Sequence, residues 1–406
     1  MPSRPELSPA AAFTLQASII LFFLASSSAP TPLYAVYQAA WGFSPVTVTV
    51  VFGIYAVAVL ATLLVVGSLS DYVGRRPVLM AATILQAGAM AIFATAGGVA
   101  TLLLARVVQG VATGAAAGAV GAGMLDIDRA KGTVANSVAP MLGTATGGMM
   151  GGLMAEYLPA PTRLVYVVLG ALFLLQAAGV ALMPESAPRR AGALRSLRPQ
   201  LRLPPAIRGP ALVAAPALVA TWALVGFYGS LGPSLARRLV GSSSLALGGL
   251  ILFVLAGSGA VTVLLSRTRS ARSVLQFGTA ALIAGVTLTL IAIGTGAVAL
   301  FFVGAAIAGA GFGSGFQGAI RTVVPLAAAT DRAGVLSVLY VIAYLSMGAP
   351  AVLAGLRVVH GGGLFATARE YGFAVIVLAA AALLGALTRP TTAAVAVPVP
   401  VVSTKG

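Results

Sequence analysis

The chain lacks cysteine altogether, and it has one histidine and only 8 acidic residues among 406. The absence of cysteine excludes disulfides and thiolate chemistry. The single histidine, His360, lies in a glycine-rich stretch, where we expect a solvated loop residue. With so few ligands we expect no metal site, and with no nucleophile–base pair we expect no enzyme.

Charge is scarce as well, at 8% of the residues compared with about 25% in soluble domains. Hydrophobic residues make up 59% of the chain, and the mean hydropathy is +1.03. A chain this apolar predicts a lipid bilayer as its solvent. The net charge of +16 is typical of nucleic-acid binders. The basic residues, however, lie in short loops between apolar runs, so we expect no nucleic-acid partner.

Long apolar runs are abundant, and each is close to the roughly 20 residues that a membrane-spanning helix needs. In lipid the backbone must satisfy its own hydrogen bonds, so these runs predict helices. The expected fold is therefore an all-α polytopic membrane protein. Its twelve transmembrane helices are expected at about 12–32, 45–66, 77–96, 99–122, 134–156, 162–183, 210–232, 244–265, 275–294, 297–320, 333–356 and 370–388.

The loops divide unequally in lysine and arginine. With both termini on the cytoplasmic side, that side carries 17 of these residues and the outer side carries 5. Positive loops stay in the cytoplasm, and this distribution requires an even number of spans. We therefore predict a multi-pass membrane protein with both termini inside. The Ala-, Gly- and Arg-rich composition points to a GC-rich genome, so we expect the cytoplasmic (inner) membrane of a bacterium.

The longest polar break separates two sets of six spans. We predict an N-terminal six-helix bundle at 1–183, a cytoplasmic linker at 184–209, a C-terminal six-helix bundle at 210–388 and a disordered tail at 389–406. A weak repeat relates the halves: DRAKG at 128–132 precedes the fifth span, and DRAG at 331–334 precedes the eleventh. Two pseudo-symmetric halves around a midplane site are typical of transporters.

A polar motif, GSLSDYVGRRP at 67–77, connects the second and third spans. It resembles the loop between helices two and three of the major facilitator superfamily, whose pattern is Gly-x-Leu-x-Asp-x-x-Gly-Arg-Arg/Lys. All six family positions are filled, including Gly67, Asp71, Gly74, Arg75 and Arg76. The segment 183–186, with Pro-Glu after the sixth span, is similar to a second signature of the superfamily.

The resemblance implies a conformational latch at this loop. In the superfamily the aspartate contacts the loop arginine and the start of helix eleven when the cytoplasmic side is closed, and an acid from the end of helix four joins them. Here these residues are Asp71, Arg75 and Asp126, with helix eleven starting near 332–334. The sequence itself places Gly67 and Asp71 on one helix face. An alternative is a tight turn and topology signal with no role in switching.

The fourth span contains an arginine, although a charge inside a span costs about 3 to above 10 kcal/mol. Arg106 and Gln109 resemble the superfamily's fourth-helix motif Arg-x-x-Gln-Gly. This resemblance implies a role in proton coupling or in lining the central cavity. A structural role is compatible with it, because guanidinium donors can satisfy carbonyls freed by Pro30 and Pro32 in the first span.

The fifth span has five glycines in ten residues, at Gly143, Gly147, Gly148, Gly151 and Gly152. The pattern resembles Gly-x-x-x-Gly-Pro-x-x-Gly-Gly of the drug–proton antiporter branch, with glycine in place of the proline. Glycines at this density allow close packing against the opposite half. Ordinary small-residue packing is the alternative interpretation.

In the superfamily, helices 1, 4, 7 and 10, with 2, 5, 8 and 11, line the cavity. No acidic residue lies in the middle of a predicted span, so a cation near Arg106 would be uncompensated. We therefore expect a neutral or weakly anionic, partly apolar substrate. Besides Gln109, the candidate lining residues are Gln16, Tyr34, Tyr37, Tyr55, Trp222, Tyr228, Gln317, Tyr340 and Tyr344.

Together these features predict a monomeric secondary transporter that exports small organic compounds in exchange for protons, with no cofactor beyond the proton gradient. A metabolite importer or facilitator is the alternative, favoured by the missing buried acid and the missing proline. A non-transporting membrane sensor is a remote alternative, which the intact loop motif disfavours.

Overall fold

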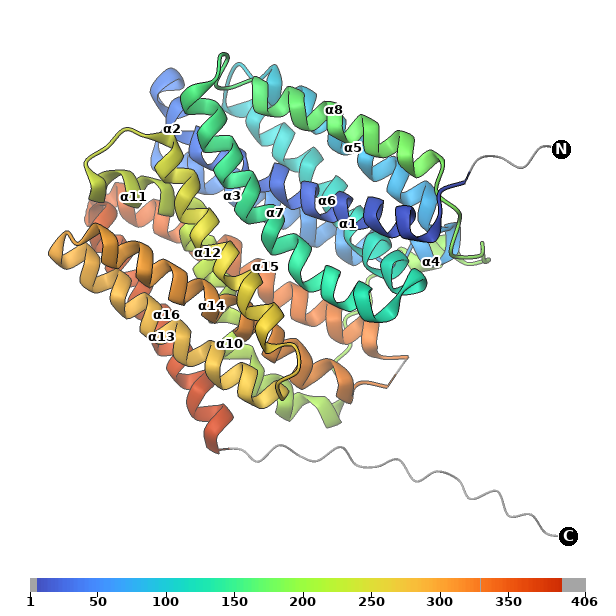
Figure 1. Cartoon of the computed structure of the whole chain (residues 1–406). Coiled ribbons are helices and arrows are strands. Elements are labelled where there is room, and N and C mark those ends of the chain that lie inside the picture. The colour runs from blue at the N-terminus through green and yellow to red at the C-terminus, as the bar shows by residue number, and fades with distance from the viewer. Residues whose placement is uncertain (1–5, 329, 389–406) are drawn as a thin grey trace, which may run out of the picture.

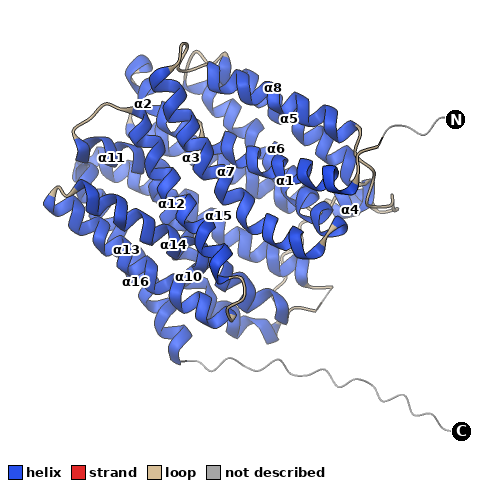
Figure 2. Ribbon diagram, in the orientation of Figure 1, coloured by secondary structure: helices blue, strands red, loops and turns tan. Residues whose placement is uncertain are grey.

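The computed structural model describes residues 6–328 and 330–388, and this part of the chain is helical with no strand (Figures 1 and 2). The predicted tail at 389–406 lies outside the described residues. Twelve described helices have 18 or more residues. They are α1 (Pro9–Ser28), α3 (Pro45–Val66), α5 (Arg75–Ala94), α6 (Val99–Ile127), α7 (Arg129–Tyr157), α8 (Leu164–Ala181), α10 (Pro205–Ser230), α12 (Leu245–Ser266), α13 (Ala271–Thr295), α14 (Val298–Val323), α15 (Arg332–Arg357) and α16 (Gly363–Thr388).

Shorter helices join or extend these twelve. They are α2 (Pro30–Trp41), which continues α1, together with α4 (Ser70–Val73), α9 (Ala193–Ser196) and α11 (Gly232–Val240). Ten described segments meet the length and hydropathy of a membrane span. The glycine-rich α7 is not among them, and α15 and α16 form one continuous apolar run from Arg332 to Thr388. The left-handed Gly361 divides that run (φ 105°), so the prediction of twelve helices agrees with the structure.

Local sequence signals set the ends of the helices. Ser8 and Ser244 precede α1 and α12 and accept hydrogen bonds from backbone N–H groups of the first turn. Asp128 does the same for α7, accepting from the next turn's N–H groups at 2.9 and 3.0 Å. These are the residue types that best satisfy free N–H groups at a helix start. Gly42 and Gly296 end α2 and α13 in the left-handed conformation that suits glycine.

The helices form two bundles, α1–α8 and α10–α16, which lie side by side in Figure 1. The first bundle packs around buried side chains that include Phe23, Phe93 and Phe173. The second packs around a separate core that includes Phe301 and Leu282. The bundles meet where α7 runs along α12 and where α3 runs along α15.

Because successive long helices run in opposite directions, one end of both bundles collects the most basic segments. We call this the basic end; it carries the starts of α5, α7 and α15 and the end of α12. At the opposite end the halves are in close contact. A Cβ on Gly152 would lie 3.1 Å from the Cα of Ala246, and a Cβ on Gly355 would lie 3.0 Å from the Cβ of Thr49. The two bundles are therefore sealed against each other at the end opposite the basic loops.

Candidate functional site

The loop before α5 gathers three of the predicted latch residues. Arg75 is 8% exposed, and its guanidinium forms an ion pair with Asp71 and a second one with Asp126 at 3.3 Å. It also donates to the hydroxyl of Ser70 at 2.8 Å. The structure thus brings Asp71, Arg75 and Asp126 together from α4, α5 and α6.

Glu185 closes the same loop from the other side. Its carboxylate accepts from the backbone N–H of Arg75 at 2.7 Å and of Arg76 at 3.1 Å, at the N-terminus of α5. Gly74 adopts φ 103°, and a Cβ there would lie 2.8 Å from the carboxyl carbon of Glu185. The sequence motif accounts for Gly74 as a turn residue, but the contact with Glu185 was missed. Its only signal was the Pro-Glu pair after the sixth span.

Gly67 and Asp71 do not share a helix face as predicted, because α3 ends at Val66 and α4 begins only at Ser70. Helix α6 approaches the backbone of Gly67 closely: a Cβ on Gly118 of α6 would lie 3.4 Å from the Cα of Gly67. The close packing therefore depends on the missing side chain of Gly118, whereas a Cβ on Gly67 would meet only the backbone of Leu63 in the preceding turn. Arg76 donates to the carbonyl of Ala181 at the end of α8, within the first bundle.

The start of α15 contacts the linker in this conformation. Arg202 forms an ion pair with Asp331 at 3.1 Å, and its N–H donates to the carbonyl of Gly334 at 3.4 Å. The carboxylate of Asp71 is half exposed and pairs with Arg75. A contact of Asp71 with α15 therefore remains a prediction for a conformation whose basic end is closed.

Arg106 is the largest fully buried side chain and lies on α6 with 1% of its surface exposed. Its Nε donates to the hydroxyl of Tyr34 at 2.8 Å, and a terminal nitrogen also contacts this hydroxyl. The other terminal nitrogen donates to the Ser27 carbonyl at 2.9 Å and to the Gln109 amide oxygen at 2.6 Å. Gln109 in turn donates to the carbonyl of Ser26 at 3.0 Å.

The carbonyls of Ser26 and Ser27 are available because α1 ends at Ser28 and Pro30 begins α2. Proline has no N–H with which to bind a carbonyl of the preceding turn. The predicted structural role of Arg106 at the break in the first span matches this geometry. A proton-coupling role is compatible with it and remains a prediction.

Neutral groups complete the surroundings of Arg106. Its guanidinium carbon lies 5.6, 5.3 and 5.7 Å from the ring centroids of Tyr34, Tyr55 and Phe93. Its described hydrogen bonds all go to neutral oxygens, and none of the ion pairs in the described residues includes it. A buried charge without a counter-ion is costly, and such a site favours an anionic or electron-rich neighbour.

An aromatic cluster occupies the second half. Trp222 of α10 lies 5.0 Å from Tyr344 of α15 and 5.4 Å from Phe316 of α14, between ring centroids. Tyr340 lies one turn from Tyr344, with its ring centroid 6.4 Å away. The indole nitrogen of Trp222 is buried without a hydrogen-bond partner. The cluster is therefore aromatic, and the indole N–H of Trp222 is a buried donor without a partner.

The α3–α15 contact joins the arginine site to this aromatic cluster. A Cβ on Gly348 would lie 3.5 Å from the Cβ of Ala56, so the helices touch next to Tyr55 and one turn from Tyr344. Tyr55 also faces Arg106. At this contact the two halves thus bring together chemically different groups: a cationic, hydrogen-bonded set in the first half and an aromatic set in the second.

The family model of the major facilitator superfamily matches residues 17–352, which is most of the chain and includes every residue of the site described above. The chain belongs to the major facilitator superfamily. It is therefore a membrane transporter by family, and its substrate and direction are separate questions.

Solved superfamily structures share the fold at low sequence identity. The human organic anion transporter MFSD10 (TETRAN) is 17% identical with a TM-score of 0.64, over 93% of this chain and 100% of that one. A bacterial homologue of the human lysosomal transporter Spinster, inward-facing and occupied, is 14% identical with a TM-score of 0.71, over 95% and 96%. A variant of the nucleoside transporter NupG is 13% identical with a TM-score of 0.68, over 92% and 99%.

The five glycines on α7 of this superfamily member form two packing faces. A Cβ on Gly143 would lie 3.1 Å from the Cβ of Leu24, and Gly147 and Gly151 likewise approach the backbone of α1. Gly148 and Gly152 face α12 of the other half, where a Cβ on Gly148 would lie 2.9 Å from the Cδ1 of Leu252. The expected packing against the opposite half is thus made by two of the five.

Several predicted cavity residues lie within a single half of this superfamily fold. Gln16 packs between α1 and α6 against Gly123, and Tyr37 bonds to the hydroxyl of Tyr166 at 3.2 Å. Tyr228 bonds to the hydroxyl of Thr289 at 2.9 Å. These three are buried and hydrogen-bonded or packed within one bundle. Of the predicted set, the structure instead places Tyr34 and Tyr55 around Arg106.

Proposed function

We propose that this superfamily member is a proton-coupled exporter of small, partly apolar organic compounds that are neutral or weakly anionic. The observation that carries the proposal is the environment of Arg106, a fully buried cation whose hydrogen bonds all go to neutral groups. Transport proceeds by alternating access between the two bundles, as expected for the superfamily.

The charge of the substrate follows from Coulomb's law. A cation about 5 Å from the guanidinium of Arg106 is repelled by about 3 kcal/mol at an effective dielectric constant of about 20. This energy corresponds to a loss of more than about a hundredfold in affinity. An anion at the same place is attracted to Arg106 instead of repelled. A neutral aromatic compound can pack against the cluster around Trp222.

The direction of transport is supported by α7. Its glycines place no side chains between α7 and either α1 or α12. Helix α7 can therefore shift against either neighbour as the halves move. The pattern resembles that of drug–proton antiporters, apart from Gly148 in place of proline. The missing proline and the missing buried acid favour a facilitator as the second candidate.

The test uses purified protein in liposomes loaded with a fluorescent aryl carboxylate. An imposed proton gradient should drive net movement of the dye against its concentration, and a protonophore should abolish this movement. Movement of the dye only down its own gradient, unaffected by the protonophore, would assign the chain to the facilitators. An empty-vector preparation, purified and reconstituted in the same way, is the control for leakage.

A further inference from the structure

The first turns of α7 present three different faces at the basic end. Val138 and Met141 pack with Ala260 and Val263 of α12, across the boundary between the halves. Lys131, Ala135 and Leu142 follow at helical spacing on a second face, and Thr133 and Ser137 on a third. The contact with α12 therefore separates two surfaces of α7.

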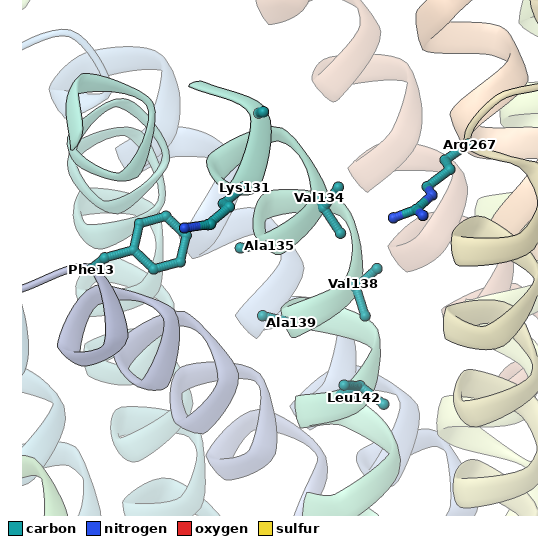
Figure 3. Close-up of a pocket in the computed structure, with 9 residues that line it drawn as sticks. Phe13, Lys131, Val134, Ala135, Val138, Ala139, Leu142 and Arg267 are labelled. Carbon is teal, nitrogen blue, oxygen red and sulfur yellow. The ribbon is translucent and has the colours of Figure 1, made fainter. Parts of the chain in front are cut away.

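The second face borders an apolar groove of about 600 Å³ (Figure 3). Its walls are Phe13 of α1 and the α7 residues Val134, Ala135, Val138 and Leu142. Leu142 is 39% exposed, and an exposed leucine on a transmembrane helix faces lipid. With Arg267 of the second half at its edge, the groove is an exposed apolar hollow beside the α7–α12 contact, and we assign it to the lipid-facing surface.

The third face borders a smaller cavity of about 130 Å³ between α7, α12 and α14. Thr133 and Ser137 line it, as do Gln317 and Arg321 of α14. The groove and this cavity have Val134, Val138 and Arg267 in common. Only the side chains between α7 and α12 thus separate the lipid-facing groove from the space between the halves.

The mouth of the groove is cationic. Lys131 and Arg267 line it from the two different halves (Figure 3). The one acid next to them is Asp128, 3.4 Å from the Lys131 ammonium, but the lysine side chain is 76% exposed, so this pair is weak. The backbone N–H of Lys131 lowers the pKa of Asp128, which is thus engaged in capping α7. Two cations and one acid leave the mouth positive.

We propose that the groove binds an anionic amphiphile dissolved in the adjacent leaflet and is the side entrance through which such a substrate reaches the space between the halves. The anionic head lies between Lys131 and Arg267, and the apolar chain lies along Phe13, Val138 and Leu142. Charge complementarity at the mouth and the apolar walls select this ligand. The entrance role rests on the proposed export function, whereas the binding site does not.

Binding is tested with the full chain in phosphatidylcholine nanodiscs and a diazirine-bearing dodecyl phosphate. After illumination we expect cross-links on residues 131–142 of α7, reduced at least fivefold in the double variant Lys131→Gln, Arg267→Gln. Arg269→Gln, in the same loop but outside both cavities, is the matched control and should label like the wild type. Equal labelling by a neutral dodecyl glycoside probe, or unchanged labelling of the double variant, would refute the site.

Transport in liposomes tests the entrance separately. We expect Arg267→Gln to slow export of dodecyl phosphate while export of a short, water-soluble aryl carboxylate is retained. Export of dodecyl phosphate at the wild-type rate, or equal slowing of both substrates, would reject the entrance and leave the proposed function standing. Labelling without transport of any compound would reject the proposed function and the entrance together, but support the binding site. Displacement of the probe by a small fraction of phosphatidylglycerol, without transport of dodecyl phosphate, would assign the groove to structural lipid and overturn the entrance.

Discussion

Glu156 joins the two halves at the end opposite the basic loops. Its carboxylate, at the end of α7, accepts from the Ser244 hydroxyl at 2.6 Å and from the Ala246 N–H at 2.7 Å, at the N-terminus of α12. All 8 acidic residues lie in the described part of the chain. Glu156 is the one whose hydrogen bonds run between the two bundles. We expect Glu156→Gln to weaken the seal at this end.

The size of the effect follows from the two hydrogen bonds. A hydrogen bond to a charged group contributes about 1.5–3 kcal/mol, and an anion at a helix N-terminus contributes about 0.3–1 kcal/mol. Glu156 is exposed, which moves both values toward their lower limits, and glutamine keeps one acceptor oxygen. A loss of about 1–2 kcal/mol is therefore expected, which increases the population open at this end about 5- to 30-fold.

The chain has no cysteine, so one introduced thiol reports the opening without background. Thr49 of α3 is 0% exposed and packs against Gly355 of α15, at the second contact between the halves. In a Thr49→Cys background, we expect Glu156→Gln to raise the rate of modification by a membrane-impermeant thiol reagent about 5- to 30-fold.

The matched control is Glu370→Gln. Glu370 also lies at the end opposite the basic loops, but it pairs with Arg357 at 2.8 Å within the second bundle. Its removal should leave the modification rate unchanged. Equal rates for Glu156→Gln and the Thr49→Cys parent, in protein that is folded and inserted, would refute the reasoning.

Three further substitutions test the packing and the loop. Gly147→Leu collides with the α1 backbone, which costs more than about 3 kcal/mol, so the melting temperature of this variant should fall steeply. The control is Gly88→Leu, which has open space around its Cβ and should melt like the wild type. Glu185→Gln weakens the acceptor at the start of α5 by about 1 kcal/mol and should lower the melting temperature by a few degrees; an unchanged value would contradict this role. Asp71→Asn should lower turnover several-fold with normal insertion, and normal transport by a well-expressed variant would remove the latch.

The architecture was largely predictable because its signals are local. Span length and the positive loops predict twelve helices, and the helices of the described chain agree with this number. The loop motif also indicated that Asp71 and Arg75 lie close together, since they are only four residues apart. Asp126, at the end of α6, joins them with a carboxylate oxygen 3.3 Å from the Nε of Arg75. The family resemblance implied this contact, and no local pattern would have shown it.

The contacts of single side chains were harder to predict because they depend on rotation of each helix about its axis. A tyrosine in an all-apolar helix has no amphipathic pattern that shows its direction. The structure shows the result: Tyr34 lies against Arg106, whereas Tyr37, three residues later, bonds to Tyr166 inside the first bundle. The direction in which each glycine of α7 faces was equally hard to predict, since Gly147 faces α1 and its neighbour Gly148 faces α12.

The most direct test of the central claim is the charge selectivity of transport in liposomes. Three aromatic probes of similar size are compared, a carboxylate, a neutral amide and a permanent quaternary ammonium, for the wild type and for Arg106→Gln. We expect the wild type to transport the carboxylate and the amide and to exclude the cation by about a hundredfold, and Arg106→Gln to reduce this exclusion at least tenfold. Coupled transport of the quaternary ammonium by the wild type would contradict the assignment of Arg106 as the residue that selects substrate charge.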